Sequence, residues 1–378
     1  MSKKILTLLA SLLFLGFSCG PDTPDVPDQP DQPGTPDQPV TVTTPAFARG
    51  ADISWVSEME KTSSFKKKDG TAADIFAVLK DCGINSIRLR VWVNPTGGYS
   101  GKDDLVALAQ RAAAAGMSLM VDFHYSDFFA DPTRQTIPAA WNADASNLPK
   151  MKEHVQAHTR EVLEALKAKG ITPAWIQIGN ETRNGMLWPA GQLWTAAGDI
   201  PGGWSNFVGL YNAGYDAAKA VFPSALVMPH LNNAYEDNDW WFAKFKQSGG
   251  KMDMIALSHY PQAETAKTPT EYNNLAISNI RALQSKYDVP VMVSEVGVKL
   301  LRWDGQKAVS IEAESAALLK SFVVTLLGTS GCKGVFYWEP EVYGGWKPAV
   351  YSTLNWAAYD QGAFDDNGSP SAVMDAFK

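Results

Sequence analysis

Cysteine is scarce in this chain, whose 378 residues include only Cys19, Cys82 and Cys332. That number excludes a disulfide framework as the source of stability. Cys82 and Cys332 leave room for one bridge, but we expect two unreactive buried thiols. Charged residues are also few, at 19%, and the formal net charge is −7. Because no basic stripe occurs in the sequence, nucleic acid is excluded as a partner.

The apolar run at residues 5–17 follows Lys3 and Lys4 and is too short to span a bilayer comfortably. It ends in Leu-Gly-Phe-Ser-Cys, which resembles a bacterial lipoprotein processing box. The resemblance implies cleavage before Cys19 and lipidation of its thiol; an ordinary secretory peptide is the alternative. We therefore expect residues 1–19 to be a lipoprotein signal peptide. The mature protein would be an exported lipoprotein, anchored at the outer membrane or cell surface.

A proline-rich and aspartate-rich segment occupies residues 20–45, with prolines at every third position from Pro21 to Pro39. Polyproline II has three residues per turn, so these rings would line one edge of a stiff, extended linker. We expect the lipid and this linker to be the only contact with a membrane. The remaining residues, 46–378, would form a single catalytic domain, which we expect to be monomeric.

From residue 48 onward, short apolar runs alternate with amphipathic segments. The predicted strands are 50–54, 86–91, 118–123, 175–178, 226–229, 254–258, 291–294 and 334–338. The predicted helices are 72–81, 103–115, 148–169, 204–221, 239–248, 270–287 and 311–329. This alternation predicts an α/β fold, a (β/α)8 TIM barrel. A doubly wound open sheet would need a glycine-rich turn after its first strand, and none is present there.

Chemistry in such a barrel gathers at the C-terminal ends of the strands. Two of these ends deliver a glutamate: Glu181 follows the strand at 175–178, and Glu295 follows the strand at 291–294. Two carboxyl groups roughly 5 Å apart are what a retaining glycosidase needs, one as nucleophile and one as acid and then base. We assign the nucleophile to Glu295 and the acid/base to Glu181.

The surroundings of the two glutamates are expected to differ. Burial and a neighbouring carboxylate should raise the pKa of Glu181. Hydrogen bonds should keep Glu295 ionised, with Arg90 and Tyr260 as the nearest donors. The chain also has 13 tryptophans, which suggests stacking surfaces for sugar rings in addition to core positions. The predicted substrate-binding residues are Arg90, Trp92, His124, Asp127, Asn180, His259, Tyr260, Trp338 and Trp346.

Two other interpretations of the function remain open at this point. Strand ends also carry His124, His230 and His259, which suggests a metal hydrolase, although residues 52–54 lack the His-x-His of barrel metal hydrolases. A glycan-binding lipoprotein without catalytic activity would share the linker, the aromatic cleft and the acidic surface.

Ordered motifs over residues 48–378 resemble glycoside hydrolase family 53, the endo-β-1,4-galactanases. They include Gly-Ala-Asp-Ile-Ser-Trp at 50–55, Asp-Phe-His-Tyr-Ser-Asp at 122–127, Gln-Ile-Gly-Asn-Glu at 177–181 and Gly-Val-Phe-Tyr-Trp-Glu-Pro at 334–340. The resemblance implies a retaining mechanism with Glu181 as acid/base and Glu295 as nucleophile. It also implies β-1,4-galactan and type I arabinogalactan as substrates. A retaining endo-β-glycanase acting on another backbone is the alternative.

Two departures from the family pattern affect these expectations. The segment after Glu295 is short, so the loop that binds calcium in some bacterial members is reduced; we expect no cofactor and no structural calcium. His259 stands where the family often has another aromatic residue, which affects only that subsite.

Overall fold

The computed structural model describes residues 42–262, 265–348, 351 and 361–378. All of them belong to the second of two units, residues 39–378. The predicted signal peptide, Cys19 and most of the linker therefore lie outside the described residues. Among the helices that are described, none is long and apolar enough to cross a membrane.

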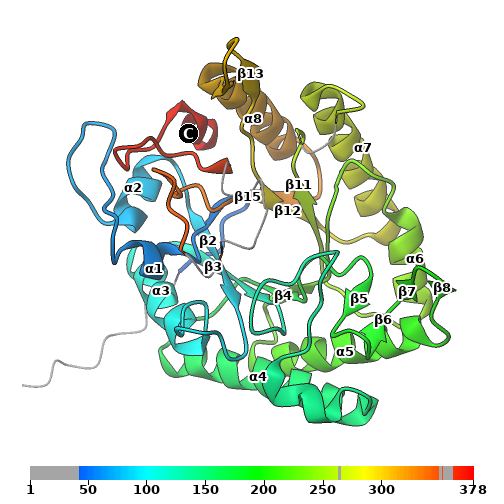
Figure 1. Ribbon diagram of the computed structural model, residues 1–378. Coiled ribbons are helices and arrows are strands. Elements are labelled where there is room, and N and C mark those ends of the chain that lie inside the picture. Colours follow the sequence, from blue (N-terminus) through cyan, green and yellow to red (C-terminus); the bar gives the residue numbers. More distant parts are fainter. Residues whose placement is uncertain (1–41, 263–264, 349–350, 352–360) are drawn as a thin grey trace, which may run out of the picture. The chain divides into compact units, whose positions relative to one another are not determined.

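A sheet of parallel strands forms the centre of this unit (Figure 1). Its order is β10-β11-β12-β15-β1-β2-β3-β4-β9. The strands are β1 (Ala48–Asp52), β2 (Ser86–Val91), β3 (Ser118–Phe123), β4 (Trp175–Ile178), β9 (Leu226–Met228), β10 (His230–Leu231), β11 (Ile255–His259), β12 (Val291–Val296) and β15 (Cys332–Trp338). The prediction of a barrel is confirmed.

The fifth strand of the barrel is interrupted at Pro229, which separates β9 from β10. Proline has no backbone N–H to give to a ladder, so it divides the strand. Before the break, β9 pairs with β4, and after it β10 pairs with β11. The two halves together occupy one barrel position, and the sheet closes through them.

Helices follow the strands along the chain and surround the barrel (Figure 1). They are α1 (Val56–Met59), α2 (Ile75–Asp81), α3 (Lys102–Ala114), α4 (Leu148–Ala168), α5 (Gly203–Val221), α6 (Asp239–Gln247), α7 (Pro269–Tyr287) and α8 (Glu312–Leu327), with 3-10 helices η1 (Ala139–Asp144) and η4 (Ala372–Phe377). Polar caps fix several starts. Asp74 accepts the N–H of Phe76, and Thr268 and Glu271 form a capping box on α7.

Side chains alternate between the two faces of the barrel wall, as a strand requires. The outward residues join the helices in one large core. The inward residues near the N-terminal ends of the strands, which we call the lower end of the barrel, form a separate apolar cluster. This apolar plug consists of Ala48, Met120, Trp175, Met228, Met254, Ala256, Met292 and Phe336. Gly50 makes room for this plug, because a Cβ atom there would overlap the ring of Phe336. Apolar side chains therefore fill the lower part of the barrel interior. Polar residues occupy only the upper part, at the C-terminal ends of the strands, which we call the mouth.

Short hairpins that periodicity does not predict extend from the upper end. They are β5 (Gly185–Met186) with β6 (Gly191–Gln192), β7 (Trp194–Thr195) with β8 (Gly198–Asp199), and β13 (Leu301–Trp303) with β14 (Ala308–Ser310). Strands of two or three residues are too short to show a period of two. The expectation for the two cysteines is confirmed: Cys82 and Cys332 are buried and free.

Candidate active site

A buried layer of polar side chains lies directly above the apolar plug. Its centre is Arg88 on β2, which is 1% exposed. The guanidinium contacts Asp52 at 2.6 Å and Asp122 at 2.8 Å, and it also donates to Asn180 Oδ1 at 3.0 Å. A buried cation is tolerated only when it is paired and hydrogen-bonded, and Arg88 meets this condition with carboxylates from neighbouring strands.

Glu295 on β12 completes the set of carboxylates around Arg88. One of its oxygens, Oε1, lies 2.9 Å from a guanidinium nitrogen of Arg88, and the other, Oε2, accepts the hydroxyl of Tyr260 at 2.9 Å. Both carboxylate oxygens thus have a donor. The prediction that Tyr260 donates to Glu295 is confirmed.

The prediction that Arg90 donates to Glu295 is wrong. Arg90 is buried and forms an ion pair with Glu339, at the end of β15. Its guanidinium carbon lies 4.9 Å from the ring centre of Trp55 and 4.7 Å from that of Phe129. Arg88 and Arg90 point to the same side of β2, but Arg88 lies deeper and takes the contact with Glu295.

Glu181 leaves the barrel just after β4 in a left-handed backbone conformation, with φ of +45°, and is preceded by Gly179 with φ of +79°. Such a conformation is costly for a residue with a side chain and persists only where neighbours enforce it. Here the backbone N–H of Glu181 donates to Nδ1 of His230 at 3.2 Å. The other ring nitrogen of His230 lies 2.9 Å from the Ser258 hydroxyl.

Ser258 is a neighbour of both glutamates. Its hydroxyl lies near the carboxyl group of Glu181 and lowers the pKa of that group. In the sheet, Ser258 on β11 stands opposite Glu295 on β12. The charge of Glu295 raises the pKa of Glu181, and both carboxyl groups raise the pKa of Tyr260, so the two glutamates lie within electrostatic reach of each other and of that hydroxyl. A pair of interacting carboxyl groups at the mouth is the arrangement that a glycoside hydrolase requires.

The two carboxyl groups differ in their electrostatic environment. Burial, together with the charge of Glu295, raises the pKa of Glu181 to about 8. Burial also raises the pKa of Glu295, but the Arg88 guanidinium and the Tyr260 hydroxyl oppose this rise. At neutral pH the proton of the pair therefore belongs on Glu181. The prediction that burial and a neighbouring carboxylate raise the pKa of Glu181 is confirmed.

The surroundings of His230 in this layer favour its neutral form. Burial holds the pKa of His230 well below its ordinary value of 6.5, and the charge of Arg88 lowers it further. Because Nδ1 accepts the N–H of Glu181, the proton of the ring sits on Nε2 and is donated to Ser258. His230 thus positions the backbone of Glu181 and also binds Ser258, which stands opposite Glu295.

Other predicted site residues lie around this pair but are bound to protein groups. The Asn180 amide donates to the carbonyl of Ala130 at 2.8 Å. His124 contacts Asp122 at 2.9 Å. Asp127 accepts two backbone N–H groups, from Asn94 and Ala139, and so ties two loops together.

Aromatic rings cover the side of the mouth nearest Arg90. The ring centre of Trp55 lies 5.2 Å from that of Trp338 and 5.6 Å from that of Trp346. Trp92 packs against Phe129 at 5.0 Å. Of the predicted aromatic positions, Trp346 keeps part of its surface exposed, whereas Trp92 and Trp338 are buried. Their contact with a sugar stays a prediction.

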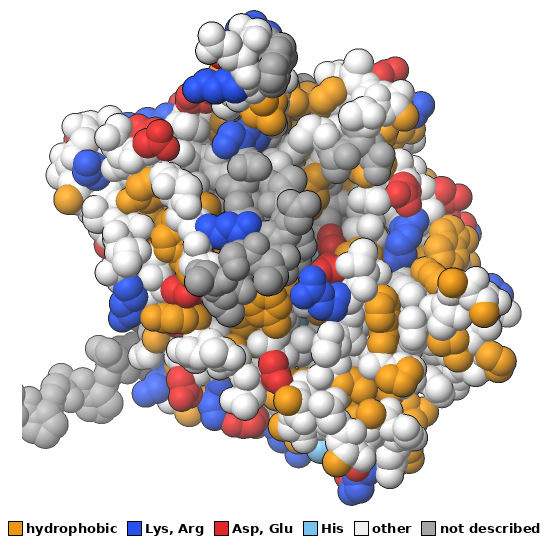
Figure 2. Space-filling view, viewed as in Figure 1, with side chains coloured by type: hydrophobic (Ala, Val, Ile, Leu, Met, Phe, Trp, Pro, Cys, Tyr) orange, Lys and Arg blue, Asp and Glu red, His pale blue; other side chains and the backbone are white. Residues whose placement is uncertain are grey.

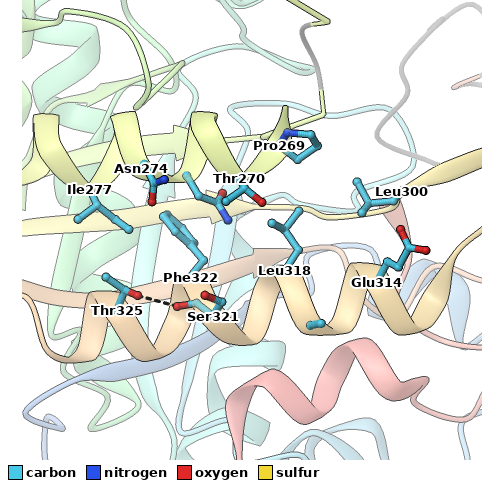
Figure 3. Close-up of a pocket in the computed structure, with 12 residues that line it drawn as sticks. Pro269, Thr270, Asn274, Ile277, Leu300, Glu314, Leu318, Ser321, Phe322 and Thr325 are labelled. Atoms are coloured by element: carbon cyan, nitrogen blue, oxygen red, sulfur yellow. Dashed lines mark hydrogen bonds between the residues drawn. The ribbon is translucent and has the colours of Figure 1, made fainter. Parts of the chain in front are cut away.

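His259 does not belong to this site, which corrects its assignment as a substrate-binding residue. Its neighbour Ser258 faces inward, so His259 faces the helices outside the barrel. There its Nε2 lies 2.7 Å from Asn273 Oδ1, and its ring packs at 4.6 Å on Phe322. Both partners line a pocket of about 410 Å³ between α7 and α8 (Figure 3).

Comparison with known proteins agrees with this geometry. The sequence model of glycosyl hydrolase family 53 matches residues 48–377. The chain belongs to this family. It is 32% identical over 319 residues to the arabinogalactan endo-beta-1,4-galactanase of Cellvibrio japonicus, covering 80% of this chain and 82% of that protein. The arabinogalactan endo-beta-1,4-galactanase of Thermothelomyces thermophilus is 30% identical over 316 residues, covering 77% and 89%.

Solved structures give the same result for this family 53 chain. The GH53 catalytic domain of Ignisphaera aggregans matches with a TM-score of 0.73 at 28% identity, covering 91% of this chain and 97% of that one. A structure from a study of two fungal beta-1,4-galactanases matches with a TM-score of 0.74 at 27% identity, covering 88% and 99%.

The arrangement of histidines in this family 53 chain disfavours the metal-hydrolase reading. His124 and His230 are hydrogen-bonded to protein groups through both ring nitrogens, and His259 faces away from the mouth. Within the described ranges, no three His, Cys, Asp or Glu side chains are grouped so that they could hold a metal ion.

Three buried charged residues near the mouth of this family 53 chain were not among the predicted site residues: Arg88, Glu339 and Glu341. Arg88 was missed because it lies two residues before the equally charged Arg90. Glu339 and Glu341 follow β15 and are buried. Burial raises the pKa of Glu339 to about 7 and that of Glu341 well above its ordinary value. The signal available in the sequence was the segment Trp-Glu-Pro-Glu at 338–341, with two acids at the end of a barrel strand.

Proposed function

We propose that this chain is an endo-acting retaining hydrolase of β-1,4-galactosidic bonds in galactan and type I arabinogalactan. The observation that carries the proposal is the unequal pair formed by Glu181 and Glu295. Burial and the charge of Glu295 raise the pKa of Glu181 to about 8, whereas the carboxylate of Glu295 is held by the Arg88 guanidinium and the Tyr260 hydroxyl. The relatives named for this activity support galactan as the backbone.

The reaction would proceed in two displacements. In the first, a carboxylate oxygen of Glu295 forms a bond to the anomeric carbon while the bond to the leaving oxygen breaks, and Glu181 gives its proton to that oxygen. In the second, water attacks the anomeric carbon, the ester to Glu295 breaks, and Glu181 takes a proton from the water. Loss of negative charge on Glu295 in the first step lowers the pKa of Glu181, which prepares it to act as a base.

A product assay tests this function. Reducing ends released from galactan are measured beside xylan, mannan and cellulose, and product length is followed over time. We expect release from galactan alone, with long intermediates appearing first, and none from the Glu295→Ala variant. Release from another backbone only would refute the specificity while keeping the mechanism. Binding to galactan without any release would favour the glycan-binding lipoprotein.

We further propose that the enzyme is a monomer and works without a cofactor or bound metal. Activity is expected to be unchanged after chelation, and light scattering should give the mass of one chain. Loss of activity on chelation, restored by calcium, would refute the first statement. A larger mass would refute the second.

The location of the protein is a separate proposal, based on residues 1–45. We propose that Cys19 is lipidated and anchors the enzyme at the outer membrane or cell surface through the linker. Wild-type protein should sediment with membranes, and the Cys19→Ala variant should be soluble. Equal partitioning of the two proteins would favour an ordinary secretory signal.

A further inference from the structure

The described tryptophan side chains fall into buried and partly exposed groups, and most of the second group lies in one stretch. Trp188, Trp194, Trp204 and Trp240 all keep part of their surface accessible. Trp240 is 41% exposed, which is unusual for so large an apolar side chain. The stretch lies downstream of Glu181 and includes the hairpins that follow β4.

Three of these rings form one cluster, which we call the tryptophan platform: Trp194 from β7, Trp204 from α5 and Trp240 from α6. The ring centre of Trp240 lies 6.0 Å from that of Trp194 and 6.5 Å from that of Trp204. Figure 2 shows hydrophobic side chains gathered on the surface where Figure 1 places α6 and the β7–β8 hairpin. Three separate elements thus place a tryptophan at the same point of the surface.

The core does not require Trp240. Its neighbour Trp241 is fully buried and supplies the packing of α6, stacking on Phe245 at 5.2 Å. The indole N–H of Trp241 donates to the carbonyl of Arg183 at 2.9 Å. Because Trp241, Phe242 and Phe245 already bury the inner face of α6, the exposed ring of Trp240 contributes little to folding.

Arg183 joins the platform to the catalytic pair. It follows Glu181 by two residues, a separation of at most about 7 Å along the backbone. Its guanidinium carbon lies 5.9 Å from the ring centre of Trp240. The same guanidinium donates to Asn238 at 2.6 Å and forms an ion pair with Glu236. The platform is therefore continuous with the rim on which the acid/base stands, and polar groups border it.

We propose that the tryptophan platform is a sugar-binding site that holds the β-galactan chain beyond the point of cleavage. The inference rests on the proposed function and deepens it. A pyranose ring has an apolar C–H face and hydroxyl groups at its edge. The accessible indole surfaces match the face, and the exposed carboxylate of Asp237, three residues before Trp240, can accept the hydroxyl groups. An enzyme that cuts within a polymer gains affinity from such a contact, which a short substrate cannot reach.

The test uses binding in the Glu295→Ala background, which does not hydrolyse the ligand. Affinities for long galactan and for galactobiose are compared in this parent and in its Trp240→Ala and Trp194→Ala derivatives. We expect each tryptophan change to weaken binding of the polymer roughly fivefold to tenfold, because one stacking contact is lost. Galactobiose is too short to span both places, so its affinity should stay within about twofold.

Leu327→Ala is the matched control, since Leu327 is 49% exposed on α8 and lies outside the platform. It should bind both ligands as the parent does. Polymer affinity that is unchanged in both tryptophan variants would overturn the proposal, and so would an equal loss for polymer and galactobiose. Self-association that disappears in Trp240→Ala would assign the platform to a second copy of the chain instead. Wild-type hydrolysis of galactan is measured in parallel: its absence refutes the proposed function, whereas hydrolysis with unchanged polymer binding refutes the platform alone.

Discussion

Left-handed backbone occurs at both ends of the barrel, but different residues adopt it. In the described turns that lead from helices back into strands, it is adopted by Gly83, Gly116, Gly170, Gly249 and Gly331, with Asp288 as the exception. Where strands β3, β4, β10 and β15 leave the barrel, Gly179 adopts it after β4, but so do four residues with side chains: Tyr125, Glu181, Asn233 and Glu339. Glycine takes this conformation without strain, whereas a residue with a side chain does so at a cost of about 1–2 kcal/mol.

The difference shows which end of the barrel is built for stability. The lower end has relaxed turns below an apolar plug. The mouth combines strained residues with buried charges around Arg88 and Arg90. Backbone strain persists only where neighbouring groups enforce it. The hydrogen bond from the Glu181 backbone to His230 therefore indicates that the strained position of Glu181 serves the reaction. Substitutions at the mouth should therefore lower activity more than stability, and substitutions at the lower end should lower stability more than activity.

The largest expected effect comes from removing either carboxyl group at the mouth. Glu295→Ala and Glu181→Ala should each lower the rate of galactan hydrolysis by roughly 10⁴-fold or more, because nucleophile and acid act as one unit. Melting temperatures should not fall, since the folded surroundings of both carboxyl groups disfavour their ionised forms. Initial rates and thermal unfolding check both statements. Glu164→Ala, an exposed position on α4, is the control and should behave as the wild type; near wild-type turnover in either variant would refute the assignment.

Arg88→Met tests a position at the mouth that, unlike the two glutamates, we expect to contribute strongly to stability. The change leaves the carboxylates of Asp52, Asp122 and Glu295 without their shared cation, so unfolding should become easier by about 3–5 kcal/mol. Activity should be lost as well. Urea denaturation measures the first effect. Arg111→Met is the control because its ion pairs with Glu60 and Asp74 are at the surface, where a loss of about 1 kcal/mol or less is expected. Equal destabilisation by the two changes would contradict this account.

Titration of Glu181 gives a pH prediction. Because the acid must carry its proton, kcat/KM should fall as pH rises through about 8, the raised pKa of this carboxyl. A pKa raised in the folded state contributes stability that is full below the ordinary value of 4.5 and is lost as pH rises toward about 8. The unfolding free energy of the wild type, relative to Glu181→Gln, should therefore decline across that window. A difference that is independent of pH would show that Glu181 titrates normally.

Tyr260→Phe should have a smaller effect, confined to one hydrogen bond. Removing the hydroxyl takes one donor from the Glu295 carboxylate and leaves Arg88 in place. A hydrogen bond to a charged group of this kind corresponds to a loss of roughly 10- to 100-fold in kcat. Steady-state kinetics on a soluble galactan measures it. An unchanged kcat would mean that Arg88 alone keeps Glu295 ionised.

At the lower end, Gly249→Ala should leave activity untouched. Gly249 has φ of +84°, and no atom of the described residues lies within 4 Å of the position that an added methyl group would take, so backbone strain is the whole effect. We expect a loss of about 1–2 kcal/mol in unfolding free energy with kcat and KM unchanged. Denaturation and kinetics on the same preparation provide the check. A fall in kcat would mean that the two ends of the barrel are coupled.

Strands and helices could be predicted because their apolar periods are long enough to be seen. The strands at 86–91, 118–123 and 175–178 have the predicted bounds, since each is fully buried and ends sharply. Glu181 and Glu295 were predicted because barrel topology places strand ends together. The short hairpins after β4 could not be predicted, because loop geometry rather than periodicity creates them.

The errors in the site share one physical origin. Position at a strand end does not say which face a side chain takes or how deep it lies. The assignment of His259 was wrong about the face, because the alternation of side chains after Ser258 turns His259 toward α7 and α8. The assignment of Arg90 was wrong about the depth, because Arg88 lies deeper on the same face of β2 and takes the contact with Glu295. Counting residues from the apolar plug upward would have separated these cases.

The central claim is that Glu295 forms the covalent bond while Glu181 carries the proton. The most direct test is the intact mass of Glu181→Gln after mixing with a 2,4-dinitrophenyl β-galactobioside, whose departure needs no acid. The account predicts a galactobiosyl adduct that accumulates and maps to the peptide containing Glu295. An adduct on another residue, or product of inverted configuration without any adduct, would contradict it.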